Sequence, residues 1–477
     1  MLQEGDSIGV FQVESRAQMS MLPRLKPKNF YDLVIEVAIV RPGPIQGKMV
    51  HPYLKRRNGE EEISYANDDI KAVLERTLGV PIFQEQVIRL AVVAAGFSPG
   101  EADQLRRAMA AWKRKGGLDH FQKKLITGML NRGHSKEFAE RIFDQIKGFG
   151  VYGFPESHAA SFALLVYISA WIKKHEPAAF YCGLLNSQPM GFYSPSQLIQ
   201  DAHRHNIKIL PVDIEKSVWE SALETLEKNK KNSEEQACIR LGFHQIKGFK
   251  KNSALNIEEA RKNSPIKNIE DAKKRAALDK GDLEKLTESG AFKSLSGNRY
   301  QTHWEVLGLP PDLPIFQSED TNYKPRPRLE SLLPSPTEAD NLRADYQNMG
   351  LTLGRHPLAM LREQKSYPFR NHQKADSLRC LRKGQIVIVS GIVTGRQRPS
   401  TASGVLFLTL EDETNNINVI IWKNIFERYK ASAVQGNLLT IKGTLEKKDR
   451  IIHVIAKEIT DVSHFLETFS LKSRDFH

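Results

Sequence analysis

The sequence predicts a multidomain α+β protein with a helical module, a helix-hairpin-helix region and a carboxy-terminal five-stranded β-barrel of the OB type. Apolar residues recur at helical spacing over residues 1–205, a basic hairpin surrounds Gly248, and five segments between residues 384 and 466 alternate like strands. At 477 residues the chain is too long for one hydrophobic core. We expect a helical domain at 1–205, a hairpin region at 206–308, a linker with short helices at 309–380, the barrel at 381–466 and a tail at 467–477.

The helical module is punctuated by glycine and proline. Residues 84–95 form one expected helix, whose apolar face carries Val87, Leu90, Ala91 and Ala94. The Ser-Pro-Gly-Glu sequence at 98–101 is typical of the start of the next helix. A further helix is expected at 159–174, after Pro155 and Ser157, with one face made of Phe162, Leu165, Val166 and Ser169.

The central region carries the hairpin at residues 245–261. The spacing of its apolar residues around Gly248 fits a helix-hairpin-helix, in which backbone N–H groups and a helix N-terminus point at a phosphate. Lys247, Lys250 and Lys251 add positive charge, although Lys250 stands where such hairpins usually have a second glycine. A half-related unit follows at 279–295, where Gly290 is expected to end a helix. Packing is the alternative to phosphate contact for both units.

The carboxy-terminal region begins with a linker rich in proline and charge at 310–336, followed by a helical piece at 339–363. Five strand candidates then alternate at 385–397, 404–414, 417–422, 438–448 and 451–460. Five strands over some eighty residues favour an OB barrel. Arg396, Arg398, Trp422 and Lys423 mix cations with an aromatic ring as single-strand DNA binders do, while burial of Trp422 in the core is the alternative.

Composition favours an anionic partner. The chain has 69 Lys and Arg against 56 Asp and Glu, a formal net charge of +13, which suits nucleic acid, a membrane surface or an acidic protein. Its three scattered cysteines indicate neither a disulfide framework nor a zinc site, and no run of 18 apolar residues occurs. We therefore expect a soluble cytoplasmic protein that does not bind a membrane.

The strongest concentration of charge lies at residues 106–115. Arg106, Arg107, Lys113, Arg114 and Lys115 place five cations within ten positions on or beside a helix, which suits a polyanion. The alternative is a surface helix whose arginines pair with Glu101 and Asp103 one turn earlier. Such pairing accounts poorly for the last three cations.

Several segments resemble the bacterial DNA polymerase III alpha subunits, the C-family DNA polymerases. They are GVFQVESRAQM at 9–19, RPGPIQGKMV at 41–50, FQEQVIRLA at 83–91, GEADQLRRAM at 100–109 and YGFPESHAASFALL at 152–165. AWKRKGG at 111–117, FYSPSQLIQDAHRH at 192–205 and SRDFH at 473–477 look like the error-prone branch. The resemblance covers nearly the whole chain and implies the fingers, hairpin and barrel of a carboxy-terminal portion.

The resemblance also implies roles for the helical module. The cations at 106–115 would face the incoming nucleoside triphosphate and the template-primer backbone. Tyr152 and His158, beside a glycine-rich turn near the nascent base pair, are expected to contact nucleotide. Arg41, in a proline-fixed turn, is expected to contact DNA or triphosphate. Capping or packing of these three side chains is the alternative.

The catalytic carboxylates of the family are not found in this sequence. Two-metal nucleotidyl transfer uses palm-domain aspartates, including an Asp-x-Asp pair, and no aspartates stand at i and i+2 here. Asp213 with Glu215 and Asp282 with Glu284 are interpreted as turn or helix carboxylates. We expect no catalytic residue and no cofactor bound by this chain, with Mg²⁺ needed by the complete polymerase.

Two further polar groups resemble metal sites. Asp201, His203 and His205 do not share one helix face, so ligation of a metal is not favoured. Glu411, Asp412 and Glu413 are interpreted as a solvated acidic turn.

The sequence as a whole indicates part of an error-prone DNA-directed DNA polymerase, a nucleotidyltransferase of translesion synthesis and repair that is inactive without its palm. Its expected partners are template-primer DNA, deoxynucleoside triphosphate and other translesion or replisome proteins. The alternative is a non-enzymatic DNA-binding or accessory protein derived from a truncated polymerase.

Overall fold

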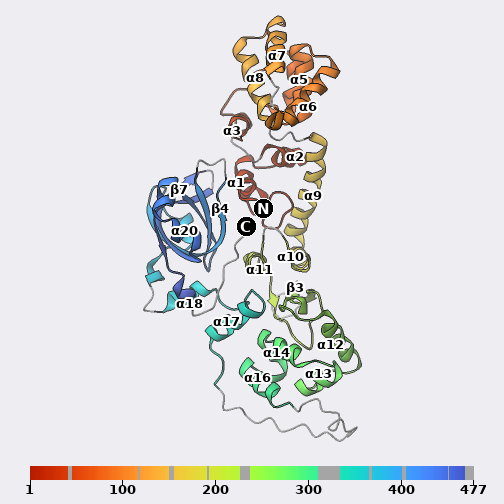
Figure 1. Cartoon of the computed structure of the whole chain (residues 1–477), viewed down its shortest axis with the longest axis vertical. Helices are drawn as coiled ribbons and strands as arrows, with labels where there is room; N and C mark the ends of the chain where they lie inside the picture. Colours follow the sequence, from red (N-terminus) through yellow and green to blue (C-terminus); the bar gives the residue numbers. More distant parts are fainter. Residues whose placement is uncertain are drawn as a thin grey trace, which may run out of the picture. The chain divides into compact units, whose positions relative to one another are not determined.

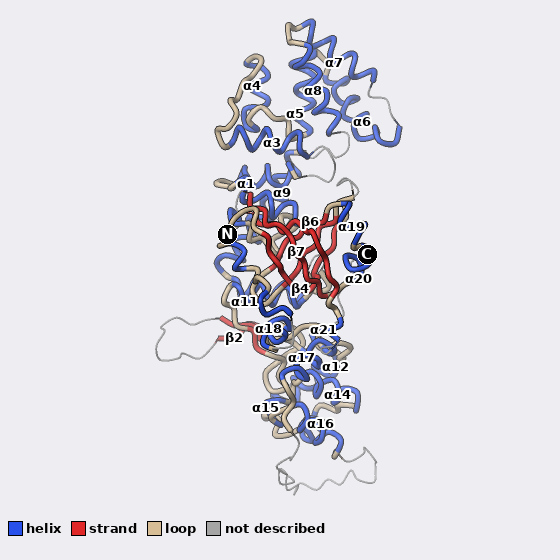
Figure 2. Tube along the Cα trace, turned by 90° about the vertical axis from the view of Figure 1, so that its left-hand side faces the viewer, coloured by secondary structure: helices blue, strands red, loops and turns tan. Residues whose placement is uncertain are grey.

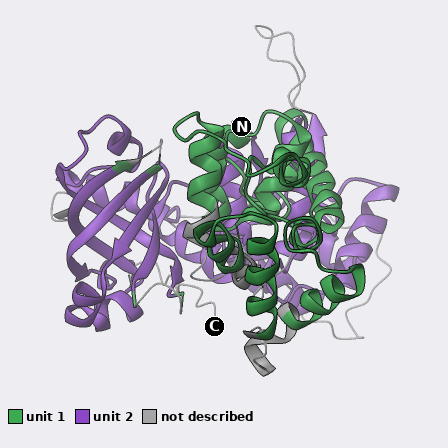
Figure 3. Cartoon of the chain, turned by 90° about the horizontal axis from the view of Figure 1, so that it is seen from above, with its two compact units in different colours: residues 1–175, 399–404, 447–451 green, residues 176–398, 405–446, 452–477 purple. Residues whose placement is uncertain are grey.

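A computed structural model describes residues 1–40, 46–115, 119–149, 155–190, 193–225, 237–309, 334–364, 368–399, 404–448 and 451–467. The chain divides into two compact units (Figure 3). One comprises residues 1–175, 399–404 and 447–451, and the other comprises residues 176–398, 405–446 and 452–477. None of the described helices is long and apolar enough to span a membrane.

The first unit is helical, and two of its predicted helices are confirmed. Its 3₁₀ turns are Leu2–Glu4 and Glu75–Thr77. Its α-helices are α1 (Arg16–Leu25), α2 (Phe30–Ile39), α3 (Gln46–Arg57), α4 (Asp68–Leu74), α5 (Gln84–Ala95), α6 (Pro99–Lys115), α7 (Asp119–Asn131), α8 (Lys136–Phe149) and α9 (Glu156–His175) (Figure 1).

Helix α5 has the bounds and the face that its periodicity predicts, because Val87, Leu90, Ala91 and Ala94 are all buried. Helix α7 packs against the end of α5 at Gly128, where a Cβ atom would stand 2.1 Å from the Ala95 carbonyl oxygen. Helix α6 begins where predicted, since the Ser98 hydroxyl accepts from the Glu101 amide and the Glu101 carboxylate accepts from the Ser98 amide.

The predicted apolar face of α9 is confirmed only in part, because Val166 is buried but Leu165 is not. The residues that α9 buries are Ala159, Ala163, Val166, Ala170 and Lys173, whereas Leu165 is 45% exposed. The helix is apolar on most sides, so hydrophobicity alone does not select the buried stripe, and the small alanines let α2 pack alongside it (Figure 1). The buried Lys173 ammonium donates to an Asp6 carboxylate oxygen at 2.7 Å and to the Ile8 carbonyl at 3.0 Å.

The second unit combines helices, a small sheet and a barrel. Its strands are β1 (Ile209–Leu210), β2 (Ala222–Thr225), β3 (Ala237–Arg240), β4 (Ile386–Gln397), β5 (Leu406–Glu411), β6 (Asn416–Ile421), β7 (Leu438–Lys448) and β8 (Ile451–Asp461). Its helices are α10 (Pro177–Asn186), α11 (Pro195–Arg204), α12 (Lys251–Asn263), α13 (Ile269–Arg275), α14 (Lys280–Ser289), α15 (Lys293–Ser296), α16 (Arg299–Leu307), α17 (Glu338–Asn348), α18 (Pro357–Glu363), α19 (Lys423–Arg428), α20 (Lys430–Gln435) and α21 (His464–Glu467). Short 3₁₀ turns lie at Phe243–Gln245, Pro368–Asn371 and Asp376–Arg379.

The predicted five-stranded barrel is confirmed. Strands β4 to β8 form a closed barrel in the order β4-β5-β6-β8-β7, drawn as the red strands that cross at the centre of Figure 2. All of its interstrand pairings are antiparallel except that of β6 with β8 among the described registers. Alternate side chains fill the interior, including Val389, Leu408, Val419, Ile441 and Val454, and this alternation is the signal that the sequence carries.

The helical piece expected at 339–363 is two helices, α17 and α18. Gly350 adopts a left-handed φ of 72° after α17, and Pro357 occupies the first turn of α18, so one continuous helix is excluded. Both helices pack on the barrel through a buried cluster of Leu342, Leu358, Met360, Leu361, Phe369, Leu438, Val462 and Leu466. The segment is therefore a packed element of the second unit.

The acidic turn after β5 is buried, contrary to the prediction that it is solvated. Asp412 is 3% exposed and Glu411 is 7% exposed. The Arg362 guanidinium of α18 donates from Nε to Glu413 at 3.2 Å and from Nη1 to the carbonyls of Phe369 and His372. These partners lie far away in sequence, so local composition does not reveal that the carboxylates are covered.

We expect Arg362→Ala to destabilise the barrel by about 1–3 kcal/mol, because the carbonyls of Phe369 and His372 lose their donor while Glu413 keeps only its second cation, Lys374 at 3.2 Å. The control is Arg355→Ala, since Arg355 also pairs with two carboxylates, Glu338 and Glu363, but on the surface. Arg355→Ala should cost much less. Hydrogen exchange of the β5 and β6 amides and the denaturant midpoint measure both effects, and equal losses would contradict a special role for the buried pair.

Candidate nucleic-acid interface

Helix α6 presents the arginines of the basic segment on its surface. Arg106 donates to Asp103 at 2.9 Å and Arg107 donates to the other oxygen of Asp103 at 2.8 Å. The hydrogen bond from Arg106 lowers the pKa of Asp103. The surface pairing that the sequence leaves open is thus observed, with Asp103 as the acceptor of both arginines. Arg107 remains 74% exposed, so its guanidinium still faces solvent.

Three more cations of this segment continue the same helix. Lys113, Arg114 and Lys115 lie in the last turn of α6, but their side chains lie outside the described residues. Arg41 and Tyr152 also lie outside the described residues. Of the predicted contacts in the helical module, Arg106, Arg107 and His158 can therefore be placed.

His158 lies in the first turn of α9 and is exposed. Its ring packs on Phe162 with 4.3 Å between ring centroids, which is the packing role left open by the sequence. The same turn is held by Glu156, which accepts from the Tyr31 hydroxyl at 2.9 Å and from Arg76 at 3.1 Å. Burial and the hydrogen bond to Glu156 raise the pKa of Tyr31.

Sequence reasoning missed this Tyr31, Arg76 and Glu156 group. Tyr31 and Glu156 are separated by 125 positions, so no local pattern connects them. The group fixes the start of α9, and hence the backbone position of His158, against α2 and the turn after α4.

The first hairpin has the expected left-handed glycine. Gly248 has a φ of 68°, and the chain then enters α12, whose N-cap residue Lys250 provides no side-chain cap. The first amides of α12 thus lack a side-chain acceptor from the N-cap, which is the arrangement that attracts an anion.

The hairpin lysines have different surroundings. Lys247 donates its ammonium to the carbonyls of Tyr346 and Gln347 at 2.8 Å, and its backbone amide donates to the Asn348 carbonyl at 2.8 Å. Lys250 forms an ion pair with Asp279. Lys251 is exposed in the first turn of α12 and has no ion pair with any described carboxylate.

The half-related unit predicted at 279–295 consists of α14 and the start of α15. Gly290 ends α14 with a φ of 79°, as predicted. Asp213 accepts from the Glu215 amide in a turn, and Asp282 closes a capping box with Asp279 at the start of α14, so both carboxylates have the structural roles expected of them.

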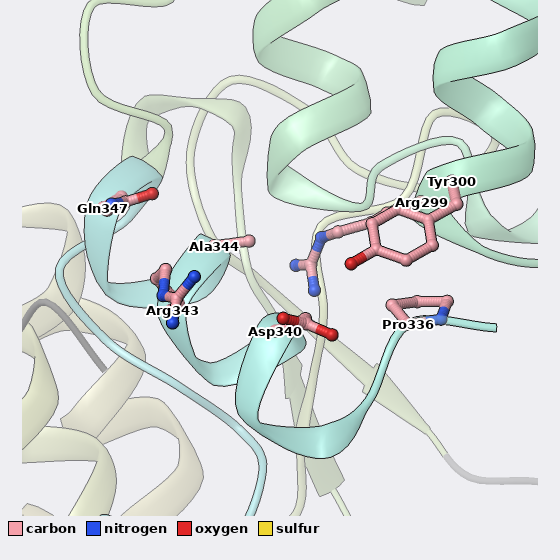
Figure 4. A pocket seen from close by; sticks show the side chains of 7 residues that line it. All are labelled: Arg299, Tyr300, Pro336, Asp340, Arg343, Ala344 and Gln347. Atoms are coloured by element: carbon pink, nitrogen blue, oxygen red, sulfur yellow. The ribbon is translucent and has the colours of Figure 1, made fainter. Parts of the chain in front are cut away.

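A small cavity of about 180 Å³ lies between α16 and α17 (Figure 4). It is lined by Arg299, Tyr300, Pro336, Asp340, Arg343, Ala344 and Gln347. Arg299 donates to the carbonyls of Glu288 and Ser289 and to the side chains of Asn341 and Asp345. These bonds occupy its guanidinium, so Arg299 joins the hairpin region to α17 and is not offered to a ligand.

The predicted residues of the barrel differ in exposure, because one is held by internal hydrogen bonds and the others face solvent. Arg396 is half-buried and donates to the carbonyls of Ala433, at 3.1 Å, and Gly436. Arg398 is exposed, with its guanidinium 4.4 Å from the centroid of the Phe426 ring. Trp422 is 51% exposed and stands at the N-cap position of α19 without a capping side-chain hydrogen bond, so burial in the core is excluded. Lys423 follows it at the surface, 3.9 Å from Glu427.

The group at Asp201 has a structural explanation. The Tyr181 hydroxyl donates to Asp201 at 2.6 Å and lies 2.9 Å from His205 Nδ1, which confirms that Asp201 and His205 share a face. Burial lowers the pKa of His203, which lies elsewhere. Among the described residues no group of three or more His, Cys, Asp or Glu could hold a metal ion.

Three families match this chain. Residues 1–133 match the bacterial DNA polymerase III alpha subunit finger domain, residues 206–302 match the helix-hairpin-helix motif, and residues 386–462 match the OB-fold nucleic acid binding domain. The described hairpin and barrel fall within the second and third matches.

Curated relatives match the chain over its whole length. The error-prone DNA polymerases of Saccharophagus degradans and Teredinibacter turnerae are each 54% identical, and that of Pseudomonas paraeruginosa is 52% identical. Each alignment covers 100% of this chain and 45–46% of the relative. The chain therefore spans about half the length of the curated relatives it matches.

The contrast between Arg396 and Arg398 gives a test. We expect Arg396→Ala to destabilise the barrel by about 1–3 kcal/mol, because two carbonyls lose their donor. Arg398→Ala should cost less than about 1 kcal/mol, the range of one exposed cation–π contact, but weaken binding of an oligo(dT) strand several-fold. Denaturant unfolding and fluorescence anisotropy measure the two properties. A loss of stability for Arg398→Ala as large as that for Arg396→Ala, or no loss of binding, would contradict the assignment.

Proposed function

Because the chain belongs to the bacterial DNA polymerase III alpha-subunit family, we propose that it is the DNA- and nucleotide-binding part of an error-prone polymerase. Its role is to hold template-primer DNA and deoxynucleoside triphosphate during synthesis across damaged templates. The single observation that carries this proposal is the match to error-prone DNA polymerases along the whole chain.

The helical module is the nucleotide-facing part in this proposal. Helix α6 supports it because Arg107 is largely exposed and the basic residues at 113–115 extend the same helix. His158 and Tyr152, with Arg41, would contact the nascent base pair or the DNA strand. Contact with a triphosphate needs cations that are held in place, and Asp103 orients both arginines.

The second unit grips DNA in this proposal. At the hairpin, Gly248 and the uncapped amides of α12 receive a duplex phosphate, and Lys251 adds charge beside them. At the barrel, the exposed Trp422 and the Arg398 guanidinium suit stacking and charge contacts with a single strand. The hydrogen bond from Arg396 to the Ala433 carbonyl holds α20 in place.

The chemical step requires carboxylates that this sequence does not supply. Two-metal nucleotidyl transfer needs closely placed acidic side chains, whereas the sequence has no Asp-x-Asp pair. The residues present therefore do not fit the Mg²⁺ pair of the family. We infer that the catalytic carboxylates belong to another part of the polymerase. This mismatch also favours the second candidate, a non-enzymatic DNA-binding protein related to the polymerase.

Primer extension tests the proposal. The purified chain should bind a primer-template duplex but add no nucleotide in the presence of Mg²⁺ and all four deoxynucleoside triphosphates. The full-length Saccharophagus degradans relative is the positive control under the same conditions. Templated incorporation by this chain alone would refute the claim that its chemistry lies elsewhere, and failure to bind the duplex would refute the DNA-binding role.

We expect the combined change Arg106→Ala, Arg107→Ala and Lys113→Ala to weaken DNA binding and to flatten its salt dependence. The slope of log K against log salt is negative, and each lost phosphate contact makes it shallower by about 0.9. The matched control removes three exposed lysines of the same unit, Lys71, Lys123 and Lys136. Equal slopes for the two triple variants, measured by anisotropy over a KCl series, would exclude α6 as the grip.

A further inference from the structure

The two hairpins of the second unit are related copies. Gly248 and Ala277, 29 positions apart, both adopt a left-handed backbone conformation, with φ of 68° and 49°. The next residue is a buried apolar side chain in each copy, Phe249 and Leu278. Each turn leads into a helix, α12 in the first copy and α14 in the second, both green in Figure 1.

Equivalent positions of the two copies bond to each other. Lys250, the N-cap of α12, forms its ion pair with Asp279, the N-cap of α14, across a separation of 29 residues. Three positions further along each helix, Ser253 donates to Asp282 at 2.8 Å, again across 29 residues. The two helix starts therefore face each other.

The two helix starts have opposite electrostatics. Asp279 accepts from the Asp282 amide at 2.7 Å, so a carboxylate already occupies the N-terminus of α14. The start of α12 has no such cap, and a lysine stands in the equivalent place. An anion is therefore accommodated at the first copy and repelled at the second.

The second copy also acts on the first. The hydrogen bond with Asp279 raises the pKa of Lys250 and lowers that of Asp279, as expected of a mutually stabilised pair. Asp282 is 3% exposed, and its Oδ1 lies 4.0 Å from the same ammonium without a hydrogen-bond partner. Two carboxylates thus draw Lys250 away from any external phosphate.

We propose that Asp279 takes the place of a DNA phosphate at Lys250, so that only the first hairpin grips DNA and does so more weakly than its lysines would allow. This inference rests on the proposed function of that hairpin. Lys251, which has no ion pair with a described carboxylate, supplies the contact that remains. Asp279 is then a residue that sets affinity for backbone phosphate.

The variant Asp279→Asn tests the proposal, because asparagine keeps the capping oxygen and removes only the charge. Its affinity for a fluorescein-labelled duplex should rise roughly two- to fivefold, the range of one exposed charge pair. The salt slope should steepen by about 0.9, since one more phosphate is contacted. The control is Glu284→Gln, which removes the same charge from the same helix beside Lys280 instead of Lys250.

A double-mutant cycle isolates Lys250. Lys250→Ala should change the affinity of the wild-type chain little, yet abolish the whole gain in the Asp279→Asn background. Thermal melting of each variant verifies that the fold is intact. If Asp279→Asn and Glu284→Gln behave alike, or if Lys250→Ala weakens both backgrounds equally, the proposal is overturned.

Lys251→Ala separates this proposal from the proposed function. If Lys251→Ala weakens duplex binding while Asp279→Asn matches its control, the hairpin grips DNA and only the role of Asp279 fails. If Lys251→Ala leaves affinity and salt slope unchanged, the hairpin is not the grip, and both ideas are overturned.

Discussion

The packing of the second unit depends on helix α17, whose polar groups are satisfied by residues of the hairpin region. Carbonyls in the last turn of this helix take the Lys247 ammonium and amide, while Asp345 and Asn341 on its body bind Arg299. On its other side Leu342 packs in the cluster shared with the barrel. Because one helix meets both neighbours, the hairpin region and the barrel belong to one packed body.

Charge in this protein is divided between holding the fold and meeting a partner. Arg362, Arg299, Lys247 and Arg396 are consumed by internal carbonyls and carboxylates. Arg107, Lys251 and Arg398 are exposed instead. A net positive charge therefore overstates the surface that nucleic acid meets, since a cation whose donors are held by internal acceptors is less available to a phosphate.

The sequence predicts those features whose cause is local. Alternation predicts the barrel, the α5 face follows from spacing, and Gly290 ends a helix as glycine commonly does. Local reasoning does not predict three other features. They are the stripe that α9 buries, the burial of the carboxylates at 411–413, and the partners of Lys247 and Lys250. Each depends on a residue tens to more than a hundred positions away, which periodicity and composition do not register.

The hydrogen bonds from Lys247 to α17 affect where the hairpin region can be cut out as a separate fragment. Composition suggests cutting at residue 308, which discards α17 together with the acceptors of a lysine and of Arg299. The excised piece would keep the hairpin sequence but lose the contacts with α17 that hold Lys247 and Arg299 in place. Minimal versions of such modules are better drawn along hydrogen-bonding partners than along stretches of sequence.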